Sequence, residues 1–139
     1  MEVNRAKDIP TNRGGEEMFR GRVWLDTLLE RDSPGEMRLY RVFFEPGART
    51  GWHRHPDGQA LLIVVGKGRV QAEGQPGVEV LPGDVVYSPP GELHWHGAAP
   101  DAGMTHLAVN PGGKTQWDEN RAVTDEEYLA DVEERTAGV

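Results

Sequence analysis

The chain has 139 residues, a formal net charge of −8 and no cysteine. This length suits one domain with its own hydrophobic core, and the absence of cysteine excludes disulfides, thiolate metal ligands and a cysteine nucleophile. The negative charge argues against nucleic acid and anionic membranes as partners, and the sequence has neither a long apolar run nor a signal peptide. We therefore expect a single domain over residues 1–139 of a cytoplasmic protein.

The first fifteen or so residues are expected to form an extended arm. Beyond them, glycines and prolines separate short runs of Val, Leu, Ile and aromatic residues, a pattern typical of many short strands. The predicted strands are 21–26, 37–45, 50–54, 58–65, 68–74, 77–80, 84–87, 93–97 and 103–109. Turn signals between them favour an all-β sandwich or barrel.

The end of the chain has a different pattern. Residues 118–135 contain eight acids and two arginines, which indicates a solvated surface. Thr124 and Glu127 form a capping-box pattern, and apolar residues follow at helical spacing. The sequence predicts a short acidic helix at about 125–134, with one face packed on the barrel.

Four of the five histidines occur in two H-x-H pairs, His53 with His55 and His94 with His96. Because side chains alternate along a strand, both members of a pair point to the same side. Two such pairs on neighbouring strands would converge inside a barrel, where His106 also lies on a predicted strand. Imidazole is a common ligand of first-row divalent metals, so the sequence predicts a site for Mn, Fe, Co, Ni or Zn rather than calcium.

Two motifs surround these histidines. Residues 47–66, GARTGWHRHPDGQALLIVVG, resemble the first cupin motif, G-x5-H-x-H-x3-E-x6-G, with Gln59 in place of the acid. Residues 83–98 begin with GDVVYSPPGELH and resemble the second motif, G-x5-P-x-G-x2-H-x3-N, with Ala98 in place of the asparagine. The resemblance to the cupin superfamily implies a single cupin domain, a double-stranded β-helix barrel of the jelly-roll type. It also implies four metal ligands: His53, His55, Gln59 and His94.

A closer resemblance extends over nearly the whole chain. The stretches FEPGART-WH-HP-GQ, PGDVV, PGE-HWHGAAP, MTHLA and VTDE-Y are similar to small bacterial manganese-dependent cupins that act as R-selective hydroxynitrile lyases. In that family three histidines and a glutamine hold the metal, and the residues at His96 and His106 are candidates for proton transfer. The resemblance therefore implies a lyase that cleaves or forms cyanohydrins. It also implies one divalent transition metal per chain, with Mn²⁺ the expected ion ahead of Fe, Ni, Co or Zn.

The chain departs from the lyase pattern at Tyr40, where that family has a small residue, and at Asn110, where it has a longer amide. Strand alternation places Tyr40 on the same face as Val42 and Phe44, so a bulky Tyr40 is expected to narrow the pocket or change the substrate. The predicted substrate pocket comprises Tyr40, Val42, Phe44, Leu61 and Asn110.

Two other functions fit the same pocket: a cupin dioxygenase acting on an oxygenated aromatic or diketone, and a binding module for a small ligand. Neutral Gln59 favours Lewis-acid chemistry over oxygen activation, and His96 and His106 favour catalysis over passive binding. Which of these two histidines is the base is left open. The expected partners are a small-molecule substrate and further copies of the chain, in a homodimer or homotetramer that covers exposed tryptophans and strand edges.

Overall fold

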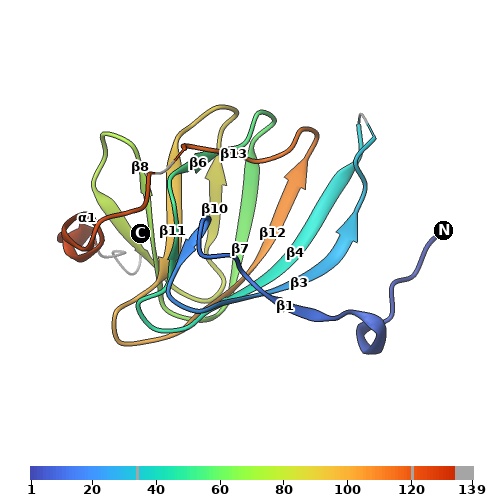
Figure 1. Ribbon diagram of the computed structural model, residues 1–139, viewed down its shortest axis with the longest axis horizontal. Coiled ribbons are helices and arrows are strands. Elements are labelled where there is room, and N and C mark those ends of the chain that lie inside the picture. Colours follow the sequence, from blue (N-terminus) through green and yellow to red (C-terminus); the bar gives the residue numbers. More distant parts are fainter. Residues whose placement is uncertain (34, 120, 134–139) are drawn as a thin grey trace.

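The computed structural model describes residues 1–33, 35–119 and 121–133. Strands dominate, in two sheets that face each other (Figure 1). The elements are η1 (Ala6–Asp8), β1 (Thr11–Arg13), β2 (Phe19–Arg20), β3 (Val23–Glu30), β4 (Met37–Phe44), β5 (Arg49–Thr50), β6 (His53–Arg54), β7 (Gln59–Gly66), β8 (Gly68–Ala72), β9 (Gly77–Val80), β10 (Val85–Ser88), β11 (His94–Ala98), β12 (Met104–Pro111), β13 (Gln116–Trp117), α1 (Asp125–Leu129) and β14 (Val132–Glu133).

The first sheet has the strand order β1-β3-β4-β12-β7-β10, and all of its pairs are antiparallel. The second sheet has the order β13-β6-β11-β8-β9-β14, and off this path β5 pairs with β11 and β2 pairs with β5. This arrangement confirms the predicted jelly-roll barrel. Every predicted strand is present, although the segment 50–54 forms two short strands, β5 and β6, rather than one.

The space between the sheets is filled by alternate side chains of the strands. In β12 the inward residues are all buried, while the residues between them are more exposed, as a half-buried strand requires. The main core cluster consists of Val23, Val42, Phe44, Ala48, Ile63, Val80, Ala98 and Met104. Gly66 ends β7 with a positive φ of 87°, and a Cβ there would collide with the Gly103 carbonyl oxygen, so this motif position needs glycine.

A second apolar cluster covers the outside of the second sheet, where α1 lies beside β8 and β11 (Figure 1). It contains Trp52, Leu93, Trp95, Val123 and Tyr128. The expectation of exposed tryptophans is therefore wrong for Trp52 and Trp95, which are buried under the chain's own C-terminal segment.

The capping box predicted at Thr124 and Glu127 is present, but the predicted extent of the helix is wrong. The helix ends at Leu129, and Val132 pairs in parallel with Gly77 of β9. The edge of β9 offers unpaired backbone groups, so strand pairing replaces further helical turns. Residue 134 of the predicted helix lies outside the described residues. No helix in the described part of the chain is long and apolar enough to cross a membrane.

Candidate metal centre

The five imidazoles gather in the barrel interior, and each is at most 5% exposed. The predicted convergence of the two H-x-H pairs is confirmed, because β6 and β11 are paired with His53 directly opposite His94. The ring centroids of these two residues are 4.4 Å apart, and the His55 ring lies 5.1 Å from His53 and 5.4 Å from His94.

Backbone carbonyls orient two of these rings. The Nδ1 atom of His53 lies 2.9 Å from the Gly51 carbonyl oxygen, and that of His94 lies 2.9 Å from the Glu92 carbonyl oxygen. A carbonyl oxygen can only accept, so each Nδ1 must carry the proton and each Nε2 must be the unprotonated nitrogen. This is how metal-binding histidines are normally oriented by the groups behind them.

His55 and Gln59 are held by side chains instead. The Nδ1 atom of His55 lies 3.2 Å from the Thr115 hydroxyl oxygen, and the Gln59 amide donates a 2.8 Å hydrogen bond to the Asn110 side-chain oxygen. That bond turns the Gln59 oxygen away from Asn110.

Three buried atoms in this group have no hydrogen-bond partner among the described residues: Gln59 Oε1 and His94 Nε2, which can only accept, and His55 Nε2, which is an acceptor when its Nδ1 donates to the Thr115 hydroxyl. Burying an unpaired acceptor is costly, so such a group calls for a bound cation or donor. Neutral nitrogen and amide-oxygen donors fit a divalent transition metal, and these residues therefore suit the metal that the sequence predicts.

His96 and His106 form a pair of their own. The Nδ1 atom of His96 and the Nε2 atom of His106 are 3.1 Å apart, and the other nitrogen of each ring has no partner in the described structure. His53, His94 and His96 also offer ring nitrogens within 4.8 Å of one another. The geometry thus brings together two overlapping sets of possible ligands, and His96, predicted only as a proton carrier, belongs to the second.

Burial lowers the pKa of all five imidazoles. Desolvation lowers the pKa of His55 and of His106 to about 4, with the nearby His94 as a further cause for His55. It also lowers the pKa of His94, and it holds the pKa of His53 and His96 well below the usual value, helped by neighbouring imidazoles. The rings are therefore neutral near pH 7, the form in which imidazole binds metals or accepts a proton.

The site adjoins a mostly apolar cavity of about 230 Å³. Four of the five predicted pocket residues line it: Tyr40, Val42, Phe44 and Asn110. The fifth, Leu61, does not: it faces the interior but lines a separate cavity with Val86, its partner in β10, and His94. Strand alternation predicts the face of Leu61 but not its height in the barrel.

Several residues that line the cavity could not be identified from the sequence pattern. Met18, Phe19, Thr115 and Trp117 all line it, and the Trp117 ring lies 4.7 Å from the His53 ring. Trp117 reaches this position because β13 pairs with β6, an arrangement between distant segments that local patterns do not reveal.

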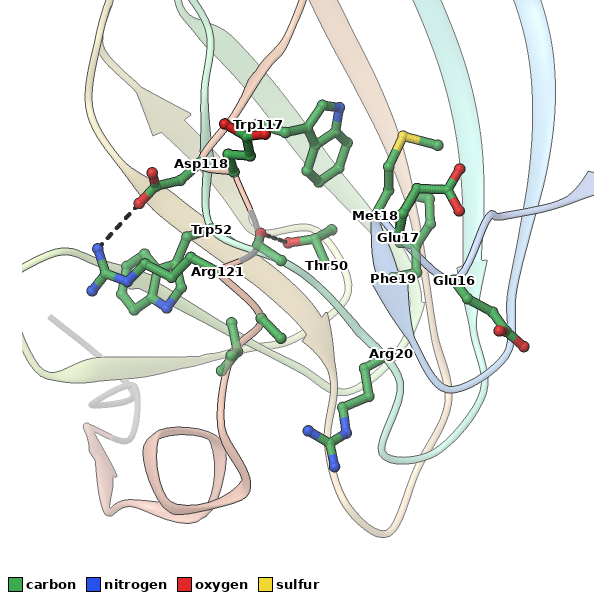
Figure 2. Close-up of a pocket in the computed structure, with 14 residues that line it drawn as sticks. Glu16, Glu17, Met18, Phe19, Arg20, Thr50, Trp52, Trp117, Asp118 and Arg121 are labelled. Carbon is green, nitrogen blue, oxygen red and sulfur yellow. Dashed lines mark hydrogen bonds and ion pairs between the residues drawn. The ribbon is translucent and has the colours of Figure 1, made fainter.

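A wider groove of about 700 Å³ lies next to this cavity (Figure 2). The two share Met18, Phe19, Thr50 and Trp117, so these residues separate the groove from the histidines. The Phe19 and Trp117 rings meet edge to face at 5.8 Å. Arg121, on the far side of the groove, lies over the Trp52 ring and contacts Asp118.

The fold and the buried donor set together define a small jelly-roll protein with a candidate metal centre. The chain belongs to the cupin family, since residues 40–110 match the model of the cupin domain.

Two relatives are similar over most of their length. The chain is 45% identical over 131 residues to an (R)-mandelonitrile lyase of Granulicella tundricola, covering 92% of this chain and 98% of that protein. It is 41% identical to a cupin-like protein of Thermotoga maritima whose crystal structure superposes with a TM-score of 0.81, covering 87% of this chain and 92% of that one. The polyketide cyclase RemF of Streptomyces resistomycificus, 18% identical with a TM-score of 0.71 over 92% of this chain and 90% of its own, shares the fold.

Proposed function

We propose that the protein is a metal-dependent lyase of the hydroxynitrile-lyase type, which cleaves or forms cyanohydrins. One observation carries this proposal: beside a mostly apolar cavity, the buried donors divide into a group suited to a metal and a separate pair of imidazoles suited to moving a proton. The similarity to an (R)-mandelonitrile lyase supports the same reaction.

In this proposal His53, His55, His94 and Gln59 hold one divalent ion, manganese. Each of the three imidazoles has its Nδ1 next to an oxygen, and the Gln59 oxygen is freed by the bond to Asn110. Such an ion, when bound, supplies Lewis acidity that makes a substrate hydroxyl easier to deprotonate.

The proton transfers are assigned to the His96–His106 pair. A neutral imidazole of the pair accepts the hydroxyl proton of the cyanohydrin. The bond between the carbinol carbon and the nitrile carbon breaks, its electron pair leaves with cyanide, and the oxygen electrons form the aldehyde carbonyl. The imidazolium then returns the proton to cyanide, so the products are the aldehyde and hydrogen cyanide. The 3.1 Å contact between the rings spreads the positive charge over both.

The apolar wall positions the rest of the substrate. Val42, Phe44 and Ala108 offer no hydrogen bonds from their side chains and suit a hydrocarbon group. Burial, with Glu30 nearby, raises the pKa of Tyr40, so its phenol stays protonated and can donate a hydrogen bond in the cavity.

The test is release of cyanide from mandelonitrile by manganese-loaded protein, with and without oxygen. We expect equal release under both conditions, no oxygen consumption, and loss of release in His106→Ala protein that retains its metal. Oxygen consumption with an oxygenated aromatic substrate and no cyanide release would assign the site to a dioxygenase. Tight binding of small anions with no turnover of any cyanohydrin would make the protein a binding module.

A further inference from the structure

A second cavity, of about 220 Å³, reaches the site histidines from another side of the barrel. It is lined by Val86 and Ser88 of β10 in the first sheet and by Val70 and Ala72 of β8 in the second. The apolar cavity of about 230 Å³, here called the first cavity, is bordered by β4, and two strands, β12 and β7, separate β4 from β10. The two cavities therefore approach the histidines from different directions.

The second cavity extends from the protein surface to the proton-transfer pair. The exposed Gln75 and Tyr87 line its outer part, and the buried His94 and His96 line its inner part. Among the described residues, His96 alone lines both cavities. The centroid of its ring lies 4.8 Å from that of His106 and 5.8 Å from that of His94. A small molecule formed at the His96–His106 pair can therefore enter the second cavity without crossing the first.

A buried hydroxyl group without a protein partner lines the second cavity. Ser88 is 4% exposed, and it lies opposite Gln59 in the pairing of β10 with β7, so its side chain is on the inner face of the sheet. The Ser88 hydroxyl makes no hydrogen bond to another described residue. Buried hydroxyl groups normally bond to protein, water or ligand, so this one offers a hydrogen-bond donor to a small molecule in the cavity.

The lining of the second cavity suits a small neutral molecule. Leu61, Val70 and Val86 give it apolar walls, and Glu92 is the one charged residue among the described residues that line it. A negative charge there disfavours a bound anion. Of the two products proposed above, hydrogen cyanide is much the smaller, is neutral at physiological pH, and has a nitrogen that can accept a hydrogen bond from Ser88.

We propose that hydrogen cyanide enters and leaves through the second cavity, while the carbon skeleton of the aldehyde occupies the first. This inference rests on the proposed lyase function. In cleavage, the bond between the carbinol and nitrile carbons breaks, and the His96–His106 pair gives the hydroxyl proton to the cyanide carbon. The hydrogen cyanide formed in this way moves into the second cavity. In synthesis it arrives by the same path, when an aldehyde already fills the first cavity.

Steady-state synthesis of mandelonitrile from benzaldehyde and cyanide by manganese-loaded protein tests this. Val86→Phe places a ring in the second cavity and should raise the KM for cyanide at least about tenfold, with the KM for benzaldehyde unchanged. Val86→Ala leaves the cavity open and is the matched control. Ala108→Val narrows the first cavity and should raise the KM for benzaldehyde alone. An unchanged KM for cyanide in Val86→Phe, or an equal rise of both KM values, overturns the proposal.

The hydroxyl of Ser88 is tested by a change that keeps the side chain small. Ser88→Val should raise the KM for cyanide about 3–10-fold, the effect of one hydrogen bond, and Ser88→Thr should restore it. Elemental analysis should find the same metal content in both variants as in the wild type. A KM for cyanide that is unchanged in Ser88→Val overturns the role of this hydroxyl.

Methyl NMR of the metal-free protein provides a measurement that needs no turnover. Added hydrogen cyanide should shift the methyl signals of Leu61 and Val86 in the second cavity and leave those of Val42 in the first cavity unchanged. Shifts at Val42 alone overturn the proposal, even if the wild type releases cyanide from mandelonitrile. A wild type that releases no cyanide overturns the lyase function instead, and shifts at Leu61 and Val86 would then still show that the second cavity binds hydrogen cyanide.

Discussion

The site histidines differ in what lies behind their rings. His53, His55 and His94 each place Nδ1 against an oxygen, whereas His96 places Nδ1 against another imidazole. The first arrangement is the one that orients metal ligands, and the second suits a ring that exchanges a proton.

Replacing His55 and His96 separately distinguishes the two possible ligand sets. His55→Ala should weaken manganese binding more than about 100-fold, because a direct ligand matters more than the 10–100-fold typical of a supporting group. His96→Ala should keep near-stoichiometric metal and lose cyanide release. The measurement is elemental analysis after dialysis, together with the cyanide assay. Loss of metal in His96→Ala with retention in His55→Ala would assign the site to His53, His94 and His96.

Thr115 supports His55 from a segment 60 residues away. Thr115→Val keeps the shape and removes the hydroxyl, so the ring loses the group that fixes its orientation. We expect manganese affinity to fall about 10–100-fold in Thr115→Val and to recover in Thr115→Ser. Competition with a fluorescent chelator measures the affinity, and Thr105→Val on the outer sheet surface is the control. Equal affinities for the wild-type and Val proteins would leave Thr115 as a packing residue only.

Some residues of this site can be predicted from the sequence, and others cannot. The H-x-H pairs can be predicted from the sequence, because strand alternation puts both histidines of a pair on one face and the motif spacing predicts that the two strands are neighbours. Thr115 and Trp117 have no such evidence, because they reach the cavity through pairing of β13 with β6. Leu61 shows the remaining difficulty: its face follows from alternation, but its height depends on how the barrel closes.

At the scale of elements, strands were predictable wherever a period of two coincided with glycine and proline turns. Short strands such as β2 and β13 were not, because two residues cannot display a period. The C-terminal helix begins where its capping box predicts and ends early, because residues beyond it pair with β9. Start signals are local, whereas the end of an element depends on what the following residues can bond to.

The capping box at the start of α1 should contribute measurably to stability. The Thr124 hydroxyl accepts a 3.1 Å hydrogen bond from the Glu127 backbone, and Glu127 reaches back to the Thr124 backbone at 3.0 Å. Thr124→Ala should lower the free energy of unfolding by about 1 kcal/mol, and Thr124→Ser should retain it. Urea unfolding at one protein concentration measures the difference. No change in Thr124→Ala would mean that packing of Tyr128 alone fixes α1.

The barrel has three distinct regions: its interior and the outer sides of its two sheets. The interior holds the histidines, the outside of the second sheet is covered by α1 and the residues before it, and the outside of the first sheet is left apolar. Burying five imidazoles in so small an interior costs solvation free energy, and the cost rises steeply if they become charged. The stability of the fold should therefore depend on keeping them neutral.

This dependence predicts how the metal-free protein responds to acid. Every site histidine has a folded-state pKa below its ordinary value of 6.5, so the unfolded chain binds more protons as the pH falls below 6.5. Stability should be greatest above about pH 6.5 and fall continuously to about pH 4, where His55 and His106 also protonate in the folded state. Each of these two pKa shifts corresponds to a loss of unfolding free energy on the order of 3 kcal/mol.

Urea unfolding of metal-free protein at several pH values between about 7.5 and about 4.5 measures this loss. His106→Phe removes one of the buried imidazoles and keeps a ring in its place beside Phe44, so its stability should fall less steeply with acid. Carboxylates with lowered pKa, such as Asp125, lose their contribution only below this range and leave the comparison unaffected. A free energy of unfolding that stays constant across the range would show that the imidazoles are solvated in the folded protein, and would remove the argument that a bound metal is what their unpaired nitrogens require.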